Sequence, residues 1–184
     1  PDGDHAGGLR KLFEAFVVNE LWMLRPWLYA RELIGRFPRF TSIENLAKRL
    51  REIYPNLAAL EELANLNRVP IREPFQGARI GAFAVMAPSK ARYLDLIVES
   101  EKTPESVREE PPATGGLLEK AVTKAIAFVR SLWGDEAFSP EGSTAENEMS
   151  VVQYADLCGM RVLLTGDAGR IGLSEAAGYA PSIG

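Results

Sequence analysis

The densest group of chemically reactive side chains lies at the start of the sequence, in residues 1–8 (PDGDHAGG). Two carboxylates, Asp2 and Asp4, and the imidazole of His5 fall within four residues. Carboxylate oxygens and imidazole nitrogens bind hard and borderline divalent cations, and a tight turn lets several of them reach one point. The spacing therefore predicts a metal site. The alternative is an exposed acidic turn that caps a helix.

A further carboxylate, Asp167, lies near the other end of the chain. It follows an apolar segment that predicts a strand over 159–165, and Gly166 before it allows close backbone approach. Open α/β sheets place their ligands at the carboxyl ends of strands, which makes Asp167 a candidate ligand. The alternative is a helix N-cap, because Asp is favoured at that position and a helix from Ala168 onward is expected.

The elements that must position these groups alternate between helix and strand, which predicts an α/β layered fold. Apolar periodicity and capping residues indicate the helices, and β-branched or apolar runs indicate the strands. Helices are expected from about Leu9, over 26–33, after a capping box at Thr41–Glu44, around 57–63, after Ser89 and over 117–133. Strands are expected over 16–23, 78–87, 149–156 and 159–165.

Length and composition set the limits of the possible functions. The 184 residues are 46% apolar and 25% charged, which is typical of one globular domain with its own core. No apolar run approaches the roughly 20 residues that a membrane-spanning helix needs. Cys158 is the only cysteine, so an internal disulfide is excluded, and His5 is the only histidine, so a His-rich metal site is excluded.

The net charge of −4 argues against a nucleic-acid-binding protein based on overall charge, but it conceals an asymmetry. Residues 31–92 hold 11 Lys and Arg against 6 Asp and Glu, whereas residues 93–150 hold 5 against 12. One interpretation is solvated helix faces and an acidic loop. The other is a basic surface that binds a polyanion. The basic residues in question are Arg36, Arg39, Lys48, Arg49, Arg51 and Arg72.

Together these segments resemble the metallo-β-lactamase-fold hydrolases. Residues 1–9 (PDGDHAGGL) are similar to the end of the signature H-x-[H/D]-x-D-H. Residues 147–152 (NEMSVV) and 161–168 (RVLLTGDA) are similar to a later pair of strands in that superfamily. The subgroup most similar is the hydrolase domain of DNA-internalisation competence proteins and their soluble relatives, in which Asp replaces the second His and N-x-x-S-x-V precedes a T-G-D strand.

The resemblance implies an αβ/βα sandwich that is incomplete at both ends. Residues 1–184 would form a single partial domain cut from a longer chain, with a helical insertion over 36–76. No histidine occurs after His5, so the family's middle and last His ligands have no counterpart within these residues.

The same resemblance implies roles for four residues. Asp2 would stand where the second His ligand usually stands, Asp4 and His5 would bind the second metal, and Asp167 would bridge both. Asp4 would also orient or deprotonate the attacking water. One or two divalent ions, Zn²⁺ or Mn²⁺, are expected, and Asp2 in place of His shifts the preference toward Mn²⁺ or Mg²⁺.

The implied activity is hydrolysis, favouring phosphodiester bonds, by a hydroxide held by the metal. The expected partners are nucleic acid or another phosphodiester, together with flanking domains or segments of the parent chain. Two alternatives stay open. One is hydrolysis of a small ester, thioester or lactam, and the other is a metal-free, degenerate scaffold that acts as a binding or sensing module.

Overall fold

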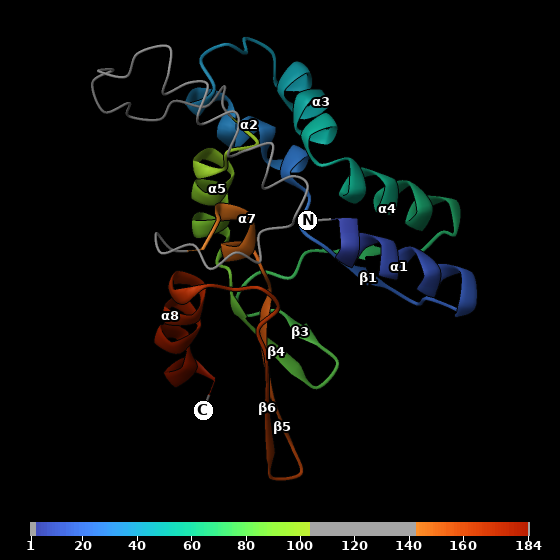
Figure 1. Cartoon of the computed structure of the whole chain (residues 1–184), viewed down its shortest axis with the longest axis vertical. Helices are drawn as coiled ribbons and strands as arrows, with labels where there is room; N and C mark the ends of the chain where they lie inside the picture. The colour runs from blue at the N-terminus through green and yellow to red at the C-terminus, as the bar shows by residue number, and fades with distance from the viewer. Residues whose placement is uncertain (1–2, 104–142, 184) are drawn as a thin grey trace, which may run out of the picture. The chain divides into compact units, whose positions relative to one another are not determined.

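The computed structural model describes residues 3–103 and 143–183, with the backbone alone described for 3–7. These residues form a mixed α/β structure (Figure 1), which confirms the predicted class at this coarse level. They belong to one compact unit. The helix expected over 117–133 lies outside the described residues. None of the helices described is long and apolar enough to cross a membrane.

The described helices and strands follow the chain in this order. The α-helices are α1 (Gly3–Ala15), α2 (Ala30–Leu33), α3 (Ile43–Ile53), α4 (Pro55–Leu66), α5 (Lys90–Glu99), α7 (Ala145–Glu148) and α8 (Arg170–Tyr179). The 3-10 helices are η1 (Pro26–Tyr29), η2 (Ile34–Arg36) and η3 (Ala180–Ser182). The strands are β1 (Leu21–Trp22), β2 (Ile71–Arg72), β3 (Arg79–Ile80), β4 (Phe83–Ala87), β5 (Val152–Leu157) and β6 (Met160–Leu164).

Helix α3 shows how the larger core forms. Leu46 and Leu50 lie one turn apart on one face, and both are fully buried. The helix begins one residue later than the capping box predicts, because Ser42 and not Thr41 is the N-cap. The Oγ atom of Ser42 accepts a hydrogen bond from the backbone N–H of Asn45.

The same core joins α3 to η1, α2, α4 and α5. Pro55 occupies the first turn of α4, where its missing N–H has no intrahelical partner to lose. Leu33 of α2 and Ile97 of α5 are fully buried in this core. The helices expected over 26–33, around 57–63 and after Ser89 are thereby confirmed.

The strand expected over 16–23 is wrong for most of its length. Only Leu21 and Trp22 form a strand, β1, which pairs in parallel with Ile71 and Arg72 of β2. A strand exists only where a second strand supplies hydrogen-bonding partners, and β2 offers two residues. The β-branched composition of the segment did not show this limit.

A four-stranded antiparallel sheet in the order β3-β4-β5-β6 lies beside α8 (Figure 1). The single strand expected over 78–87 is a hairpin, because the chain reverses between Ile80 and Phe83 at Gly81, whose φ is +58°. Glycine adopts this left-handed conformation without steric cost. The strand expected over 159–165 is confirmed as β6, and the one expected over 149–156 is confirmed as β5 from Val152 onward, since residues 149–151 are not part of a strand.

The reversal between β5 and β6 is a two-residue turn at Cys158 and Gly159. Both residues have positive φ, +56° and +87°, which is the conformation of a type I′ hairpin turn. The N–H of Gly159 donates to Oδ1 of Asp156 at 2.8 Å. The side chain of Cys158 is exposed at this turn.

Candidate functional site

The turn that carries Asp167 joins β6 to α8, and it lies against Ser150, in the segment between α7 and β5. Gly166 has a φ of +52°, and a Cβ atom at this position would lie 3.3 Å from the Cβ of Ser150. The backbone at residue 166 therefore lies close to Ser150 in a left-handed conformation, and both features favour glycine there. Asp167 follows directly and is exposed. Its location at the carboxyl end of β6 is the one that the sequence predicted.

The alternative role of Asp167 as a helix N-cap is wrong. Helix α8 begins at Arg170, its N-cap is Gly169, and no side chain of that cap accepts a hydrogen bond. The first N–H groups of α8 instead meet a carboxylate from another element. Gly172 donates to Oε2 of Glu148 at 2.6 Å, and Ile171 donates to Oε1 at 3.4 Å.

Glu148 is thus a structural determinant of the site that the sequence analysis missed. It is 4% exposed. Helix N-termini carry partial positive charge, which stabilises a carboxylate there. A Cβ atom on Gly169 would lie 2.2 Å from the Cβ of Ser143 and 2.3 Å from Oε1 of Glu148, so a larger residue at position 169 would force both of these groups to move. The one signal for Glu148 in the sequence was its place in the segment of Asn147 and Ser150. Nothing in that segment indicated a contact with a helix start more than twenty residues away.

The short helix α7 fixes this carboxylate. Its N-cap is Thr144, whose Oγ1 accepts from the N–H of Asn147 at 3.2 Å. Glu146 is also buried, and its carboxylate accepts a hydrogen bond from the Ser100 hydroxyl beyond the end of α5. Side-chain hydrogen bonds therefore hold α7 in place. Ser150 comes two residues after the end of α7, so its position is held as well.

A cavity of about 280 Å³ opens beside Asp167. Its polar lining includes Asn147, Ser150 and Asp167, and the remainder is mostly apolar. Tyr93 lines it and is 1% exposed. Burial raises the pKa of Tyr93 well above its ordinary value, so this tyrosine is neutral at physiological pH.

Residues from the first helix and from the turn after the last strand line the same cavity. Leu9 of α1 lines it together with Gly166 and Asp167. Asp4 and His5 lie in the first turn of α1, upstream of Leu9, and Asp2 lies outside the described residues. The tight turn expected around Asp4 is not formed, because the helix predicted from about Leu9 already begins at Gly3.

The donor set for a metal ion includes one side chain that the structure describes, the carboxylate of Asp167. Within the described part of the chain, no group of three or more His, Cys, Asp or Glu side chains could hold an ion. Asp167 alone is too few ligands for a catalytic metal, which needs three or more. A metal site at this turn would therefore need further ligands from outside these described side chains, and the sequence resemblance offers Asp2, Asp4 and His5.

The predicted basic surface is largely engaged within the molecule. Four of its six cations form ion pairs, which favours solvated, paired helix faces over a polyanion-binding surface. The pairs are Arg36 with Asp95, Arg49 with Glu52, Arg51 with Glu61 and Glu62, and Arg72 with Glu20. Two of these arginines also contact tryptophan rings, since Arg51 lies over the ring of Trp27 and Arg72 over that of Trp22.

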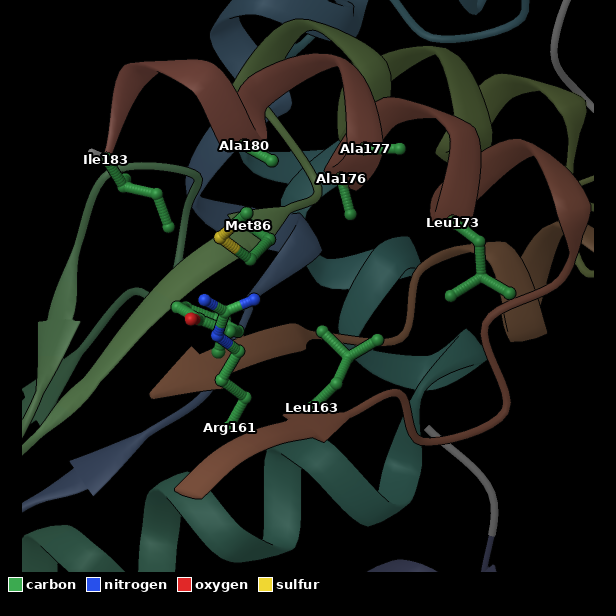
Figure 2. A pocket seen from close by; sticks show the side chains of 9 residues that line it. Met86, Arg161, Leu163, Leu173, Ala176, Ala177, Ala180 and Ile183 are labelled. Carbon is green, nitrogen blue, oxygen red and sulfur yellow. The ribbon is translucent and has the colours of Figure 1, made fainter. Parts of the chain in front are cut away.

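A larger cavity, about 530 Å³, lies between α8 and the sheet (Figure 2). Leu173 and Ala176 of α8 line one side of it, and Met86, Arg161 and Leu163 of the strands line the other. None of the residues predicted for the site lines this cavity.

Its chemistry is also poor. Arg161 is the one charged side chain among the described residues that line it, and Arg161 stands opposite Asp156 in the β5–β6 register. Active sites combine an apolar pocket with several convergent polar groups. Only the cavity beside Asp167 has such a group of polar residues, of the two cavities described.

Comparison with protein-family models, with curated proteins and with solved structures found no match to this chain. The resemblance to metallo-β-lactamase-fold hydrolases therefore stays a prediction.

Proposed function

We propose that this chain belongs to a metal-dependent hydrolase that cleaves phosphodiester bonds, built on a metallo-β-lactamase-like sandwich. The single observation that carries the proposal is that one cavity adjoins both the β6–α8 turn with Asp167 and, through Leu9, the helix α1, whose first turn contains Asp4 and His5. These are the segments that the sequence resemblance requires to meet.

The chain's own residues would divide the work as follows. Asp2, Asp4, His5 and Asp167 would hold one or two divalent ions, Zn²⁺ or Mn²⁺. When bound, such an ion lowers the pKa of water and polarises the phosphoryl oxygen. Asp4 would orient the attacking water and accept its proton. The fixed path of the chain past Ser150 would keep Asp167 at the opening of the cavity.

Elemental metal analysis of the protein and its Asp167→Ala variant tests the proposal. We expect about one to two equivalents of metal in the wild-type protein after incubation with Zn²⁺ or Mn²⁺, and a loss in the variant. Asp156→Ala is the matched control, since Asp156 is also an exposed aspartate of the β5–β6 hairpin but does not line the cavity. A wild-type protein that stays empty would leave the metal-free binding scaffold as the better reading.

A further inference from the structure

We infer that the substrate of the proposed hydrolase is a small phosphodiester with one apolar ester group, an aryl or short alkyl group, and not a nucleic-acid strand. The inference rests on the proposed function, because it concerns the ester group of the substrate that would enter the cavity next to Asp167. It is argued from the depth, the charge and the size of the cavity that opens there.

The cavity becomes apolar away from Asp167. Gly166 and Asp167 are exposed and mark its opening, whereas Leu60 and Tyr93 are 3% and 1% exposed and mark its depth. Trp22 lies on its wall and is partly buried. An apolar group that enters from the side of Asp167 would be removed from water at a gain of about 25 cal/mol per Å².

The charge of the lining disfavours a polyanion. The charged side chains among the described lining residues are Glu146 and Asp167, both acidic. A nucleic-acid strand repeats a phosphate at every nucleotide and needs Lys or Arg along its path. Arg72 lies over the ring of Trp22, but its Nε donates to a carboxylate oxygen of Glu20 at 2.8 Å, so its charge is balanced.

The size of the cavity limits the apolar group. A cavity of about 150 Å³ accommodates benzene. The 280 Å³ beside Asp167 therefore fits one substituted ring or a short alkyl chain, and it is too small for a long acyl chain. A scissile phosphoryl group would remain at the opening, where Asp167 lies.

Two diesters that release the same leaving group test the inference. Phenyl 4-nitrophenyl phosphate and thymidine 5′-(4-nitrophenyl phosphate) both yield 4-nitrophenolate, so the comparison isolates the retained group. In the presence of Mn²⁺ we expect kcat/KM to be at least tenfold higher for the phenyl ester. Equal or higher kcat/KM for the thymidine ester would overturn the inference, as would cleavage of an oligonucleotide that falls steeply with salt.

A pair of variants on one helix links the preference to the cavity. Leu57 of α4 lines it and is partly buried, while Leu66 at the end of α4 is 82% exposed and lies away from it. Leu57→Ala should lower the ratio of the two kcat/KM values at least threefold. Leu66→Ala should leave the ratio unchanged. An unchanged ratio in a folded Leu57→Ala protein would overturn the assignment to this cavity.

Binding without turnover separates this inference from the proposed function. Titration calorimetry with diphenyl phosphate and dimethyl phosphate, in EDTA, reports the apolar cavity alone. Because the methyl groups of dimethyl phosphate are too small to fill 280 Å³, we expect diphenyl phosphate to bind at least tenfold more tightly, and equal binding would overturn the inference. A protein that takes up no metal but binds diphenyl phosphate would contradict the proposed hydrolase. A protein that takes up metal but prefers the thymidine ester would contradict only the substrate class.

Discussion

Replacement of Glu148 tests whether a buried carboxylate determines where α8 begins. A hydrogen bond to a charged group contributes about 1.5–3 kcal/mol, and a backbone N–H left buried without a partner costs about 1–3 kcal/mol. Glu148→Ala removes the 2.6 Å bond from Gly172 and the longer bond from Ile171, and it leaves the N–H of the buried Gly172 without an acceptor. We therefore expect a loss of about 3 kcal/mol in the free energy of unfolding.

The two buried glutamates of α7 provide a matched comparison. In Glu148→Gln, the new amide NH₂ faces backbone N–H groups, which cannot reverse their polarity. In Glu146→Gln, the amide faces the hydroxyl of Ser100, which can rotate and accept a hydrogen bond. Glu148→Gln should therefore cost about 1–2 kcal/mol more than Glu146→Gln, although both residues are buried to a similar degree.

Urea unfolding at pH 7, followed by circular dichroism, measures these differences through the midpoint at constant m-value. The proposed metal content of each variant is a second readout. Glu148→Gln should bind metal more weakly than Glu146→Gln, because the start of α8 also sets the path of the turn with Asp167. Equal costs for the two Gln variants, or a cost below about 1 kcal/mol for Glu148→Ala, would refute the reasoning.

Two further predictions concern pH and backbone conformation. Burial raises the pKa of Tyr29 and Tyr93 in the folded protein, whereas the same groups in the unfolded chain lose their protons near pH 10. The unfolded state then binds fewer protons, so stability should fall above about pH 10 by up to about 1.4 kcal/mol per pH unit for each tyrosine. Urea unfolding at pH 9, 10 and 11 measures this, and a flat profile would contradict it. Gly166→Ala should lose about 1–2 kcal/mol in thermal or urea unfolding, because alanine disfavours a φ of +52° and its Cβ meets Ser150 at 3.3 Å. Gly178→Ala in α8 is its control and should gain about 0.5–1 kcal/mol, since its Cβ would meet no atom within 4 Å.

The helices were predictable because their information is local. In α3 and α5, apolar residues recur at helical spacing, and a serine stands at each N-terminus. Ser89 caps α5 by accepting from the N–H of Arg92, as Ser42 caps α3. Both signals are contained within about one turn of chain.

The strands were less predictable because their partners are remote. The hairpin β3–β4 has no Asn-Gly or Asp-Gly turn, and its apolar residues read as one continuous strand around Gly81. Strand β1 ends after Trp22 because β2 offers only two residues for pairing. Neither partner can be recognised from the segment itself.

The residues of the candidate site also differ in whether the signal for them is local in the sequence. Asp167 was predictable, because an apolar strand followed by Gly166 and a carboxylate is a local pattern. Glu148 was not, because a buried acid that accepts from a distant helix start leaves no spacing in the sequence. Its neighbours Asn147 and Ser150 drew attention through a family resemblance, whereas Glu148 itself accepts the hydrogen bonds from the start of α8.

The arrangement at the start of α8 separates two tasks that one aspartate could have combined. An Asp at the N-cap would satisfy the first N–H groups of the helix with its own carboxylate. Here Gly169 occupies the N-cap, and Glu148 supplies the acceptor from α7. Gly169 and Glu148 depend on each other, since a side chain at residue 169 would overlap the carboxylate of Glu148. Because the helix start does not depend on Asp167, that carboxylate can lie at the opening of the cavity, where a ligand or substrate would be met.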